Sequence, residues 1–195
     1  MFDLYVITDQ SLSKGRSNVE IARSAYEGGA DVVQLRMKGA TKDEMLKDAL
    51  AIKEIADDLN KFFIVNDNVN LALDVNADGI HVGQDDMEAG NVRALIGPKK
   101  ILGVSVRTPE EAVLAEKNGA DYLGAGAVFH TGSKSDAVDI THEALREICS
   151  AVRIPVVAIG GINAKNAREL SGSGIAGLAV ISAIFASHDI KGAAQ

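Results

Sequence analysis

The 195-residue sequence lacks the features of several protein classes. It has a single cysteine, Cys149, so no internal disulfide can form, which favours a reducing compartment. Tryptophan is absent and aromatic residues make up only 4% of the chain, too few for a base-stacking surface. No apolar run reaches the ~18 residues of a membrane span, and the first five residues have no basic region typical of a signal peptide. We therefore expect a cytoplasmic protein that does not interact with membranes.

The chain also lacks an excess of positive charge. Its formal net charge of −7 argues against nucleic acid as a partner. Small anionic ligands stay compatible with this charge, because local Arg, Lys and backbone N–H groups bind phosphate even on an acidic protein. The fractions of hydrophobic and charged residues, 47% and 24%, are those of a soluble globular protein, and the length predicts one domain over residues 1–195.

What the sequence does contain is a regular alternation of short apolar runs and helical segments. The runs are nearly continuous in apolar character, which is typical of parallel strands covered on both faces. Thr41 with Glu44 and Thr108 with Glu111 have the spacing of capping boxes at helix starts. The expected strands are 4–8, 32–36, 62–65, 79–82, 102–104, 122–125, 156–158 and 178–181. The expected helices are 19–27, one that ends near residue 59, 69–73, 91–96, one that begins at 109, 141–151, 165–170 and 183–187.

Eight such strand–helix units predict an α/β fold, either a closed barrel or an open doubly wound sheet. Barrels typically have ~250 residues and seldom fewer than ~200, so the final helix has to be short or missing. Polar side chains follow nearly every strand, whereas an open sheet would concentrate them at one switch point. We therefore favour a single (β/α)8 barrel, the TIM-barrel architecture, with a short final helix.

Three polar residues at the end of the second strand indicate an anion site. Gln34, Arg36 and Lys38 alternate along an extended segment, and this period of two places their side chains on one side. Arg and Lys together receive a multiply charged anion such as a diphosphate. The alternative is a set of solvated charges, but acidic residues after the next two strands favour a site.

Those acidic residues are Asp67 and Asp86, which we expect to bind a hard cation such as Mg²⁺. Taken alone, the Asn66-Asp67-Asn68 run is also typical of a turn. The Asp85–Asp86 pair is equally compatible with a helix cap or with solvated charges. The sequence does not decide which of these two aspartates faces the metal.

Two further stretches suit a phosphate group. Residues 131–134, Thr-Gly-Ser-Lys, offer hydroxyls and a cation in a long loop, and this length favours a functional loop over a merely mobile one. The Gly160-Gly161 pair either lets backbone N–H groups approach a ligand or forms a plain tight turn. Barrels often bind phosphate after strands seven and eight, which here end in Gly160-Gly161 and Ile181-Ser182. The sequence thus predicts two anion sites with a metal near one of them.

The histidines and the cysteine carry weaker signals. His81 lies in an apolar strand, where a hydrogen-bonded core histidine is more common than a metal ligand or a base. His130, His142 and His188 show no ligand spacing. Cys149 has no neighbouring histidine and is expected to be a buried structural thiol.

Taken together, these motifs resemble the thiamine-phosphate synthase family. Any one of them is weak evidence, but their order along nearly the whole chain is specific. The matching runs are YVITD at 5–9, VQLRMK at 33–38, FIVND at 63–67, ADGIHVGQDD at 77–86, GVS at 103–105, GADY at 119–122, TGSK at 131–134, PVVAIGGI at 155–162 and VIS at 180–182.

The resemblance implies a Mg²⁺-dependent transferase. Its substrates would be 4-amino-2-methyl-5-(diphosphooxymethyl)pyrimidine and a thiazole phosphate. Diphosphate would leave the pyrimidine methylene, the thiazole nitrogen would attack the resulting cation, and the products would be thiamine phosphate and diphosphate. The implied catalytic residues are Arg36, Lys38, Ser105 and Lys134. The implied pyrimidine diphosphate ligands are Gln34, Arg36, Lys38, Asn66, Ser105 and Lys134, the implied thiazole phosphate ligands are Thr131, Gly132, Ser133, Gly161, Ile181 and Ser182, and the implied metal ligands are Asp67 and Asp86.

The sequence departs from this family's pattern at a few positions. Arg107 stands where the family commonly has His, Ala127 and His130 stand where it has Pro, and Ser133 replaces Thr. Related thiazole tautomerases share the barrel but lack the Asn-Asp and Gln-Arg-x-Lys patterns, so an isomerase is the first alternative. A phosphate-ligand sensor without catalytic activity is the second. A homo-oligomer is compatible with the sequence.

Overall fold

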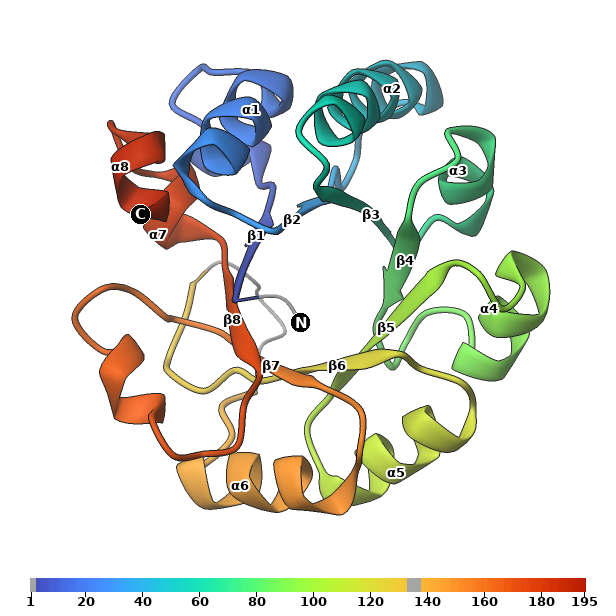
Figure 1. Ribbon diagram of the computed structural model, residues 1–195, viewed down its shortest axis with the longest axis vertical. Coiled ribbons are helices and arrows are strands. Elements are labelled where there is room, and N and C mark those ends of the chain that lie inside the picture. Colours follow the sequence, from blue (N-terminus) through green and yellow to red (C-terminus); the bar gives the residue numbers. More distant parts are fainter. Residues whose placement is uncertain (1–2, 133–137) are drawn as a thin grey trace.

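The computed structural model describes residues 3–132 and 138–195, and its strands form a closed barrel. Neighbouring strands pair in parallel from β1 to β8, and β8 pairs with β1. Viewed along the barrel axis, the strands form a central ring with the helices outside it (Figure 1). The expected (β/α)8 barrel is therefore confirmed. The strands are β1 Leu4–Ile7, β2 Val32–Leu35, β3 Phe62–Asn66, β4 Gly79–Val82, β5 Ile101–Val106, β6 Tyr122–Ala125, β7 Val156–Ile159 and β8 Gly177–Val180.

The helices follow the strands on the outside of the barrel. Most lie within a few residues of the expected ranges, because side-chain caps fix where they begin. The helices are α1 Asn18–Gly28, α2 Lys42–Asp58, α3 Val69–Asp74, α4 Ala89–Ile96, α5 Pro109–Lys117, α6 His142–Ala151, α7 Ser182–Phe185 and α8 Ile190–Ala194, with 3-10 helices η1 Gln10–Leu12 and η2 Ala167–Leu170.

The capping boxes are borne out only in part. Thr41 and Glu44 form the complete reciprocal pair at the start of α2. Thr108 accepts a hydrogen bond from the Glu111 N–H at the start of α5, as expected. The Glu111 carboxylate, however, accepts from the N–H of Arg107 at 2.6 Å instead of completing the box with Thr108.

Two expectations about the last quarter of the chain need correction. The helix expected at 165–170 is only η2, because the side-chain oxygens of Asn163 and Asn166 accept from nearby backbone N–H groups and hold the chain in turns. The short final helix is present as α7, but a second one, α8, follows it with Asp189 as its cap.

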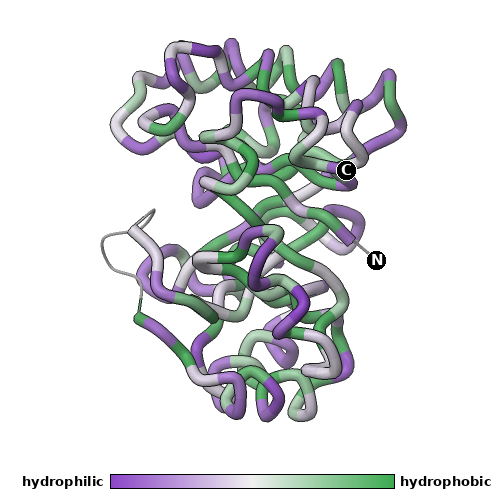
Figure 2. The backbone as a smooth tube through the Cα atoms, turned by 90° about the vertical axis from the view of Figure 1, so that its left-hand side faces the viewer, coloured by the Kyte–Doolittle hydropathy of each residue, from purple (hydrophilic) through white to green (hydrophobic). Residues whose placement is uncertain are grey.

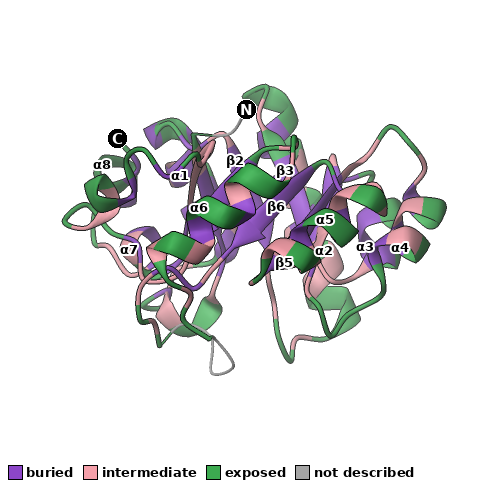
Figure 3. Cartoon of the chain, turned by 90° about the horizontal axis from the view of Figure 1, so that it is seen from below, coloured by how far each residue is buried: buried purple, intermediate pink, exposed green. Residues whose placement is uncertain are grey.

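Buried apolar side chains fill two separate layers. The outer layer lies between the strands and the helices, and its helices bury one side and expose the other (Figure 3). Hydrophobic residues accordingly concentrate along the strands in the middle of the molecule (Figure 2). The inner layer fills the barrel itself with Tyr5, Ile7, Val32, Ile64, Tyr122, Val157, Ala179 and Ile181. The polar residues at the carboxyl ends of the strands lie directly above this inner layer.

Two remaining expectations concern the cysteine and the membrane. Cys149 is a free, half-buried thiol in α6, and burial raises the pKa of this thiol. Within residues 3–132 and 138–195, none of the helices combines the length and the apolar character that a bilayer span requires.

Candidate functional site

The carboxyl ends of the strands open into a cavity of about 530 Å³. Strands β2 to β8 or the loops after them all contribute to its wall, as expected for the catalytic face of a barrel. This volume lies within the range of small-molecule sites. Ten of the residues expected at a site line this cavity: Arg36, Lys38, Asn66, Asp67, Asp86, Ser105, Thr131, Gly161, Ile181 and Ser182.

The two expected metal ligands lie together on one wall. Asp67 follows β3 in the left-handed backbone region, with a φ of 59°, which Asp tolerates better than most residues. Asp86 folds back so that its carboxylate accepts from the Gly83 N–H at 2.7 Å. The two carboxyl groups interact directly, whereas Asp85 lines the cavity without such a contact. Of the two aspartates after β4, Asp86 is therefore the partner of Asp67.

Burial and neighbouring groups shift the pKa values of the two carboxyl groups in opposite directions. Burial raises the pKa of Asp67, and the adjacent Asp86 carboxylate adds to this rise against the opposing effect of Lys38. Burial also acts to raise the pKa of Asp86, but hydrogen bonds from Asp67 and from the Gly83 N–H outweigh it, so that the pKa of Asp86 is lowered. Two adjacent carboxylates of this kind suit a divalent cation, which would offset their mutual repulsion.

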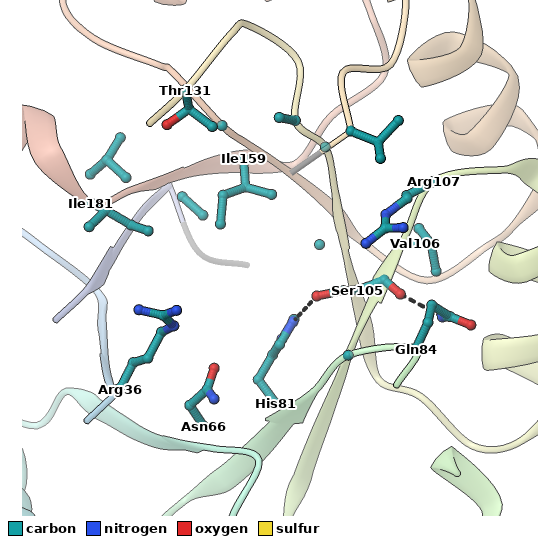
Figure 4. A pocket seen from close by; sticks show the side chains of 18 of the residues that line it. Arg36, Asn66, His81, Gln84, Ser105, Val106, Arg107, Thr131, Ile159 and Ile181 are labelled. Carbon is teal, nitrogen blue, oxygen red and sulfur yellow. Dashed lines mark hydrogen bonds between the residues drawn. The ribbon is translucent and has the colours of Figure 1, made fainter. Parts of the chain in front are cut away.

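Two cationic side chains follow β2, and Lys38 contacts the acidic pair. The Lys38 ammonium donates to the Asp67 carboxylate at 2.6 Å and is largely exposed, so it is accessible to a ligand. The Arg36 guanidinium lies 3.6 Å from the Asp9 carboxylate at the end of β1. Asp9 was not among the expected site residues, although it orients Arg36 beside the cavity. Arg36, Asn66 and His81 project from the same side of the cavity (Figure 4).

Among the described residues, Gln34 is the expected diphosphate ligand that does not line the cavity. The residue is only 2% exposed, and its side chain donates to the Tyr5 hydroxyl at 2.8 Å in the barrel interior. The expected alternation holds, but two residues along a strand span roughly 6–7 Å. Gln34 therefore lies one layer below Arg36, and direct contact between Gln34 and a ligand stays a prediction.

The opposite wall combines backbone and apolar groups. Thr131 and Ile159 lie across the cavity from Arg36, and Ile181 also lines it (Figure 4). Gly161 has a φ of 63°, and a Cβ there would lie 2.6 Å from the His130 carbonyl oxygen. The tight turn at this position thus requires glycine, and Gly161 also lines the cavity. Gly132 does not line it, and Ser133 and Lys134 lie outside the described residues.

His81, Gln84 and Arg107 also line the cavity, although the sequence assigned them no ligand. His81 is hydrogen-bonded as expected of a core histidine, to Tyr122 at 2.8 Å and Ser105 at 2.9 Å, yet it also lines the cavity. Gln84 donates to the Ser105 carbonyl at 2.7 Å. Arg107 directs its guanidinium toward the cavity on the side of Ser105 (Figure 4). Gln84 follows β4 and Arg107 follows β5, and residues directly after barrel strands are expected at the catalytic face.

The described residues fit Mg²⁺ better than a soft metal ion. No group of three or more His, Cys, Asp or Glu side chains with a metal-binding arrangement occurs in the described part of the chain. Mg²⁺ needs no such group, because it usually takes one or two carboxylates and fills its remaining positions with water and substrate phosphate. The contact between Asp67 and Asp86 meets this requirement.

The sequence matches the profile of a known enzyme family. The profile described as thiamine monophosphate synthase matches residues 4–184. The thiamine-phosphate synthase of Shouchella clausii is 48% identical over 195 residues, which cover 100% of this chain and 93% of that protein. The thiamine-phosphate synthase of Clostridium tetani is 48% identical over 192 residues, 98% of this chain and 92% of that protein.

Solved structures agree with the sequence comparison. A thiamine phosphate pyrophosphorylase from Pyrococcus furiosus superposes with a TM-score of 0.91 at 46% identity, covering 98% of this chain and 91% of that one. An N-acetylmannosamine-6-phosphate 2-epimerase from Clostridium perfringens reaches a TM-score of 0.70 at 21% identity, which shows a shared fold and no more.

Proposed function

The chain belongs to the thiamine monophosphate synthase family, and we propose that it joins a pyrimidine methylene to the nitrogen of a thiazole phosphate. In this reaction the bond between the methylene carbon and the diphosphate oxygen breaks, and a bond between that carbon and the thiazole nitrogen forms. The products are thiamine phosphate and diphosphate. The chain is a transferase, and its relatives of 48% identity are synthases, so an isomerase or a sensor is not favoured.

The observation that carries this proposal is the arrangement of charges around one cavity. Arg36, Lys38 and the Asp67–Asp86 pair lie on one wall, and Thr131 with Gly161 lies in another part of the same cavity. A diphosphate with a metal ion suits the first group, and a single phosphate suits the second. A cavity of about 530 Å³ accommodates two small heterocycles side by side.

The residues of the chain contribute binding, orientation and charge. Arg36 and Lys38 neutralise negative charge that grows on the diphosphate as it leaves, and Ser105 contacts the pyrimidine. Lys134, outside the described residues, takes part in the same neutralisation. Asp9 holds the Arg36 guanidinium in place at 3.6 Å. Holding both substrates in line in one cavity accounts for roughly 7–11 kcal/mol of rate acceleration in favourable cases.

Asp67 and Asp86 hold the Mg²⁺ ion in this proposal. When bound, Mg²⁺ withdraws charge from the leaving diphosphate. The two carboxylates are positioned before any ion binds, since Gly83 anchors Asp86 and Lys38 contacts Asp67. No protein nucleophile is needed, because the substrate's own nitrogen forms the new bond.

The remaining ligand contacts follow the same division. The pyrimidine diphosphate is held by Gln34, Arg36, Lys38, Asn66, Ser105 and Lys134, with Gln34 acting from below the cavity. The thiazole phosphate is held by Thr131, Gly132, Ser133, Gly161, Ile181 and Ser182. We further propose that residues 1–195 act as one catalytic domain in the cytoplasm, and that copies of the chain associate in a homo-oligomer.

The proposal is tested by incubating the purified protein with Mg²⁺ and both phosphorylated precursors. We expect thiamine phosphate and diphosphate in equal amounts. Asp67→Ala should abolish most of this product while the unfolding temperature changes little, because Asp67 lies at a loop and outside the apolar core.

Asp74→Ala is the matched control, since Asp74 is an exposed carboxylate at the end of α3, outside the cavity. It should keep the full rate. Undiminished product from Asp67→Ala after treatment with a chelator would contradict the metal assignment, and failure of the unchanged protein to form product would contradict the function.

A further inference from the structure

A continuous chain of hydrogen bonds crosses the interior of the barrel beneath the cavity. It starts at Gln34 on β2, whose amide donates to the Tyr5 hydroxyl at 2.8 Å. The Tyr5 and Tyr122 hydroxyls lie 2.8 Å apart. Tyr122 contacts Nδ1 of His81 at 2.8 Å, and Nε2 of His81 contacts the Ser105 hydroxyl at 2.9 Å. Only the last two members, His81 and Ser105, line the cavity.

We propose that this chain runs in one direction, from Gln34 to Ser105, and that it turns the Ser105 hydroxyl into a hydrogen-bond donor toward the bound pyrimidine. Gln34, Tyr5, Tyr122 and His81 are then positioning residues for Ser105. The inference deepens the proposed function, on which its kinetic part rests.

The direction follows from the donor at the start of the chain. The Gln34 amide N–H donates, so Tyr5 accepts there and is set to donate onward to Tyr122. Hydrogen bonds that run the same way polarise and strengthen one another. Tyr122 then donates to Nδ1 of His81, and the His81 proton lies on Nε2 and is donated to Ser105. The Ser105 oxygen is an acceptor in this bond, and its own proton is directed to a ligand in the cavity.

All members of the chain are electrically neutral in this arrangement. Burial raises the pKa of the Tyr5 hydroxyl and the pKa of the Tyr122 hydroxyl far above neutrality, so both keep their protons. The chain therefore orients groups and does not transport charge. A buried hydrogen-bond network holds the Ser105 hydroxyl in one orientation more rigidly than solvent would hold an isolated serine hydroxyl.

The surrounding strands are shaped to accommodate these side chains. A Cβ at Gly103 on β5 would lie 2.2 Å from the Tyr122 ring, and a Cβ at Gly124 on β6 would lie 3.1 Å from the His81 ring. Both glycines occur inside strands, where glycine otherwise weakens the structure. Their presence is explained by the space that Tyr122 and His81 require.

The direction of the chain is tested without any substrate by nitrogen NMR of histidine-labelled protein. We expect His81 to be the Nε2–H tautomer, with its signals identified by their loss in His81→Asn. A proton on Nδ1 of His81 in the unchanged protein would overturn the proposal. This measurement holds even if the proposed reaction were wrong, so the two failures are distinguishable.

The consequence for Ser105 is tested with Tyr122→Phe and Tyr5→Phe. Each removes one hydroxyl outside the cavity, and we expect kcat to fall roughly threefold to tenfold while KM changes less. Tyr26→Phe is the matched control: Tyr26 is also a buried residue and its hydroxyl donates to the Phe62 carbonyl at 2.8 Å, but it belongs to the outer layer. Its kcat should stay unchanged.

A double-mutant cycle separates positioning from a general structural effect. In a Ser105→Ala background, Tyr122→Phe should produce no further fall in kcat, because there is no hydroxyl left to orient. An equal fall in kcat in both backgrounds would overturn the proposal. It would also be overturned if the kcat values of Tyr122→Phe and Tyr5→Phe matched that of Tyr26→Phe.

Discussion

At the scale of single residues, the acidic pair links local backbone conformation to the chemistry of the cavity. Asp67 holds a left-handed backbone conformation directly after β3, and Asn68 beside it caps α3 by accepting from the Leu71 N–H. The turn chemistry is therefore present, and it does not exclude the site, because Asp67 also lines the cavity. Strained conformations of this kind gather at functional sites.

The raised pKa of Asp67 predicts how Mg²⁺ affinity depends on pH. Burial and the neighbouring Asp86 raise the pKa of Asp67 above its usual value of 3.8. A proton competes with the metal for this carboxylate, so Mg²⁺ affinity should weaken as the pH falls through the raised pKa and recover as it rises. Calorimetric Mg²⁺ titrations at a series of pH values measure this. Affinity that stays constant down to the usual aspartate range would contradict it.

Arg107 provides a second prediction at this scale. In the described residues no acidic side chain forms an ion pair with its guanidinium, and the cavity it faces binds phosphorylated ligands in our proposal. Arg107→Ala should raise KM about threefold to tenfold at low ionic strength, with little change in kcat, because a uniform attraction is lost. Arg107→Lys should keep most of the affinity. An unchanged KM in steady-state kinetics of the alanine variant would exclude this role.

At the scale of elements, the final helix α8 illustrates how the end of the chain is attached. It packs against α1, and Gly28 at the end of α1 provides the space: a Cβ there would lie 2.5 Å from the Lys191 carbonyl oxygen and 2.7 Å from the Ala194 Cβ. Ile190 and Ala194 are buried in this contact. The amino-acid pattern of α8 is too short to predict a helix, because five residues rarely form one without tertiary contacts.

Gly28→Ala is therefore expected to destabilise the protein, since backbone and not a flexible side chain blocks the added methyl group. We expect a loss of about 1–3 kcal/mol in the free energy of unfolding. Ser24→Ala, at a half-buried position of α1 away from the contact of Gly28 with α8, is the control and should change little. Urea unfolding measures the free energy of unfolding of both variants. Equal values for the two would show that α8 moves to accommodate the methyl group without loss of stability.

At the scale of the whole molecule, the pairing of β1 with β8 closes the barrel, and α7 and α8 cover this junction. Ile184 and Phe185 of α7 are almost fully buried there. A chain that ends at Ser182 should therefore lose the cooperative thermal transition seen by circular dichroism, because the junction becomes exposed to water. Removal of Gln195 alone is the control. A cooperative transition in the shortened chain would show that the other strands and helices suffice.

The sequence by itself determined the strands, most helices and the barrel. The reason is that these features depend on local patterns. Each strand has its own apolar run, each of these helices has its own cap or spacing, and polar residues follow each strand directly. It also placed Asp67, Asp86, Arg36 and Lys38 at one end of the barrel, since residues after parallel strands always meet there.

Tertiary structure alone decided the depth of each side chain and its partners. Alternation along β2 gives the side on which Gln34 lies, but only the pairing of the strands sets it one layer below Arg36, next to Tyr5. The chain from Gln34 to Ser105 joins five different strands, and no local pattern encodes contacts between residues so far apart. The same reason explains why α8 and the role of Asp9 were visible only in the folded molecule.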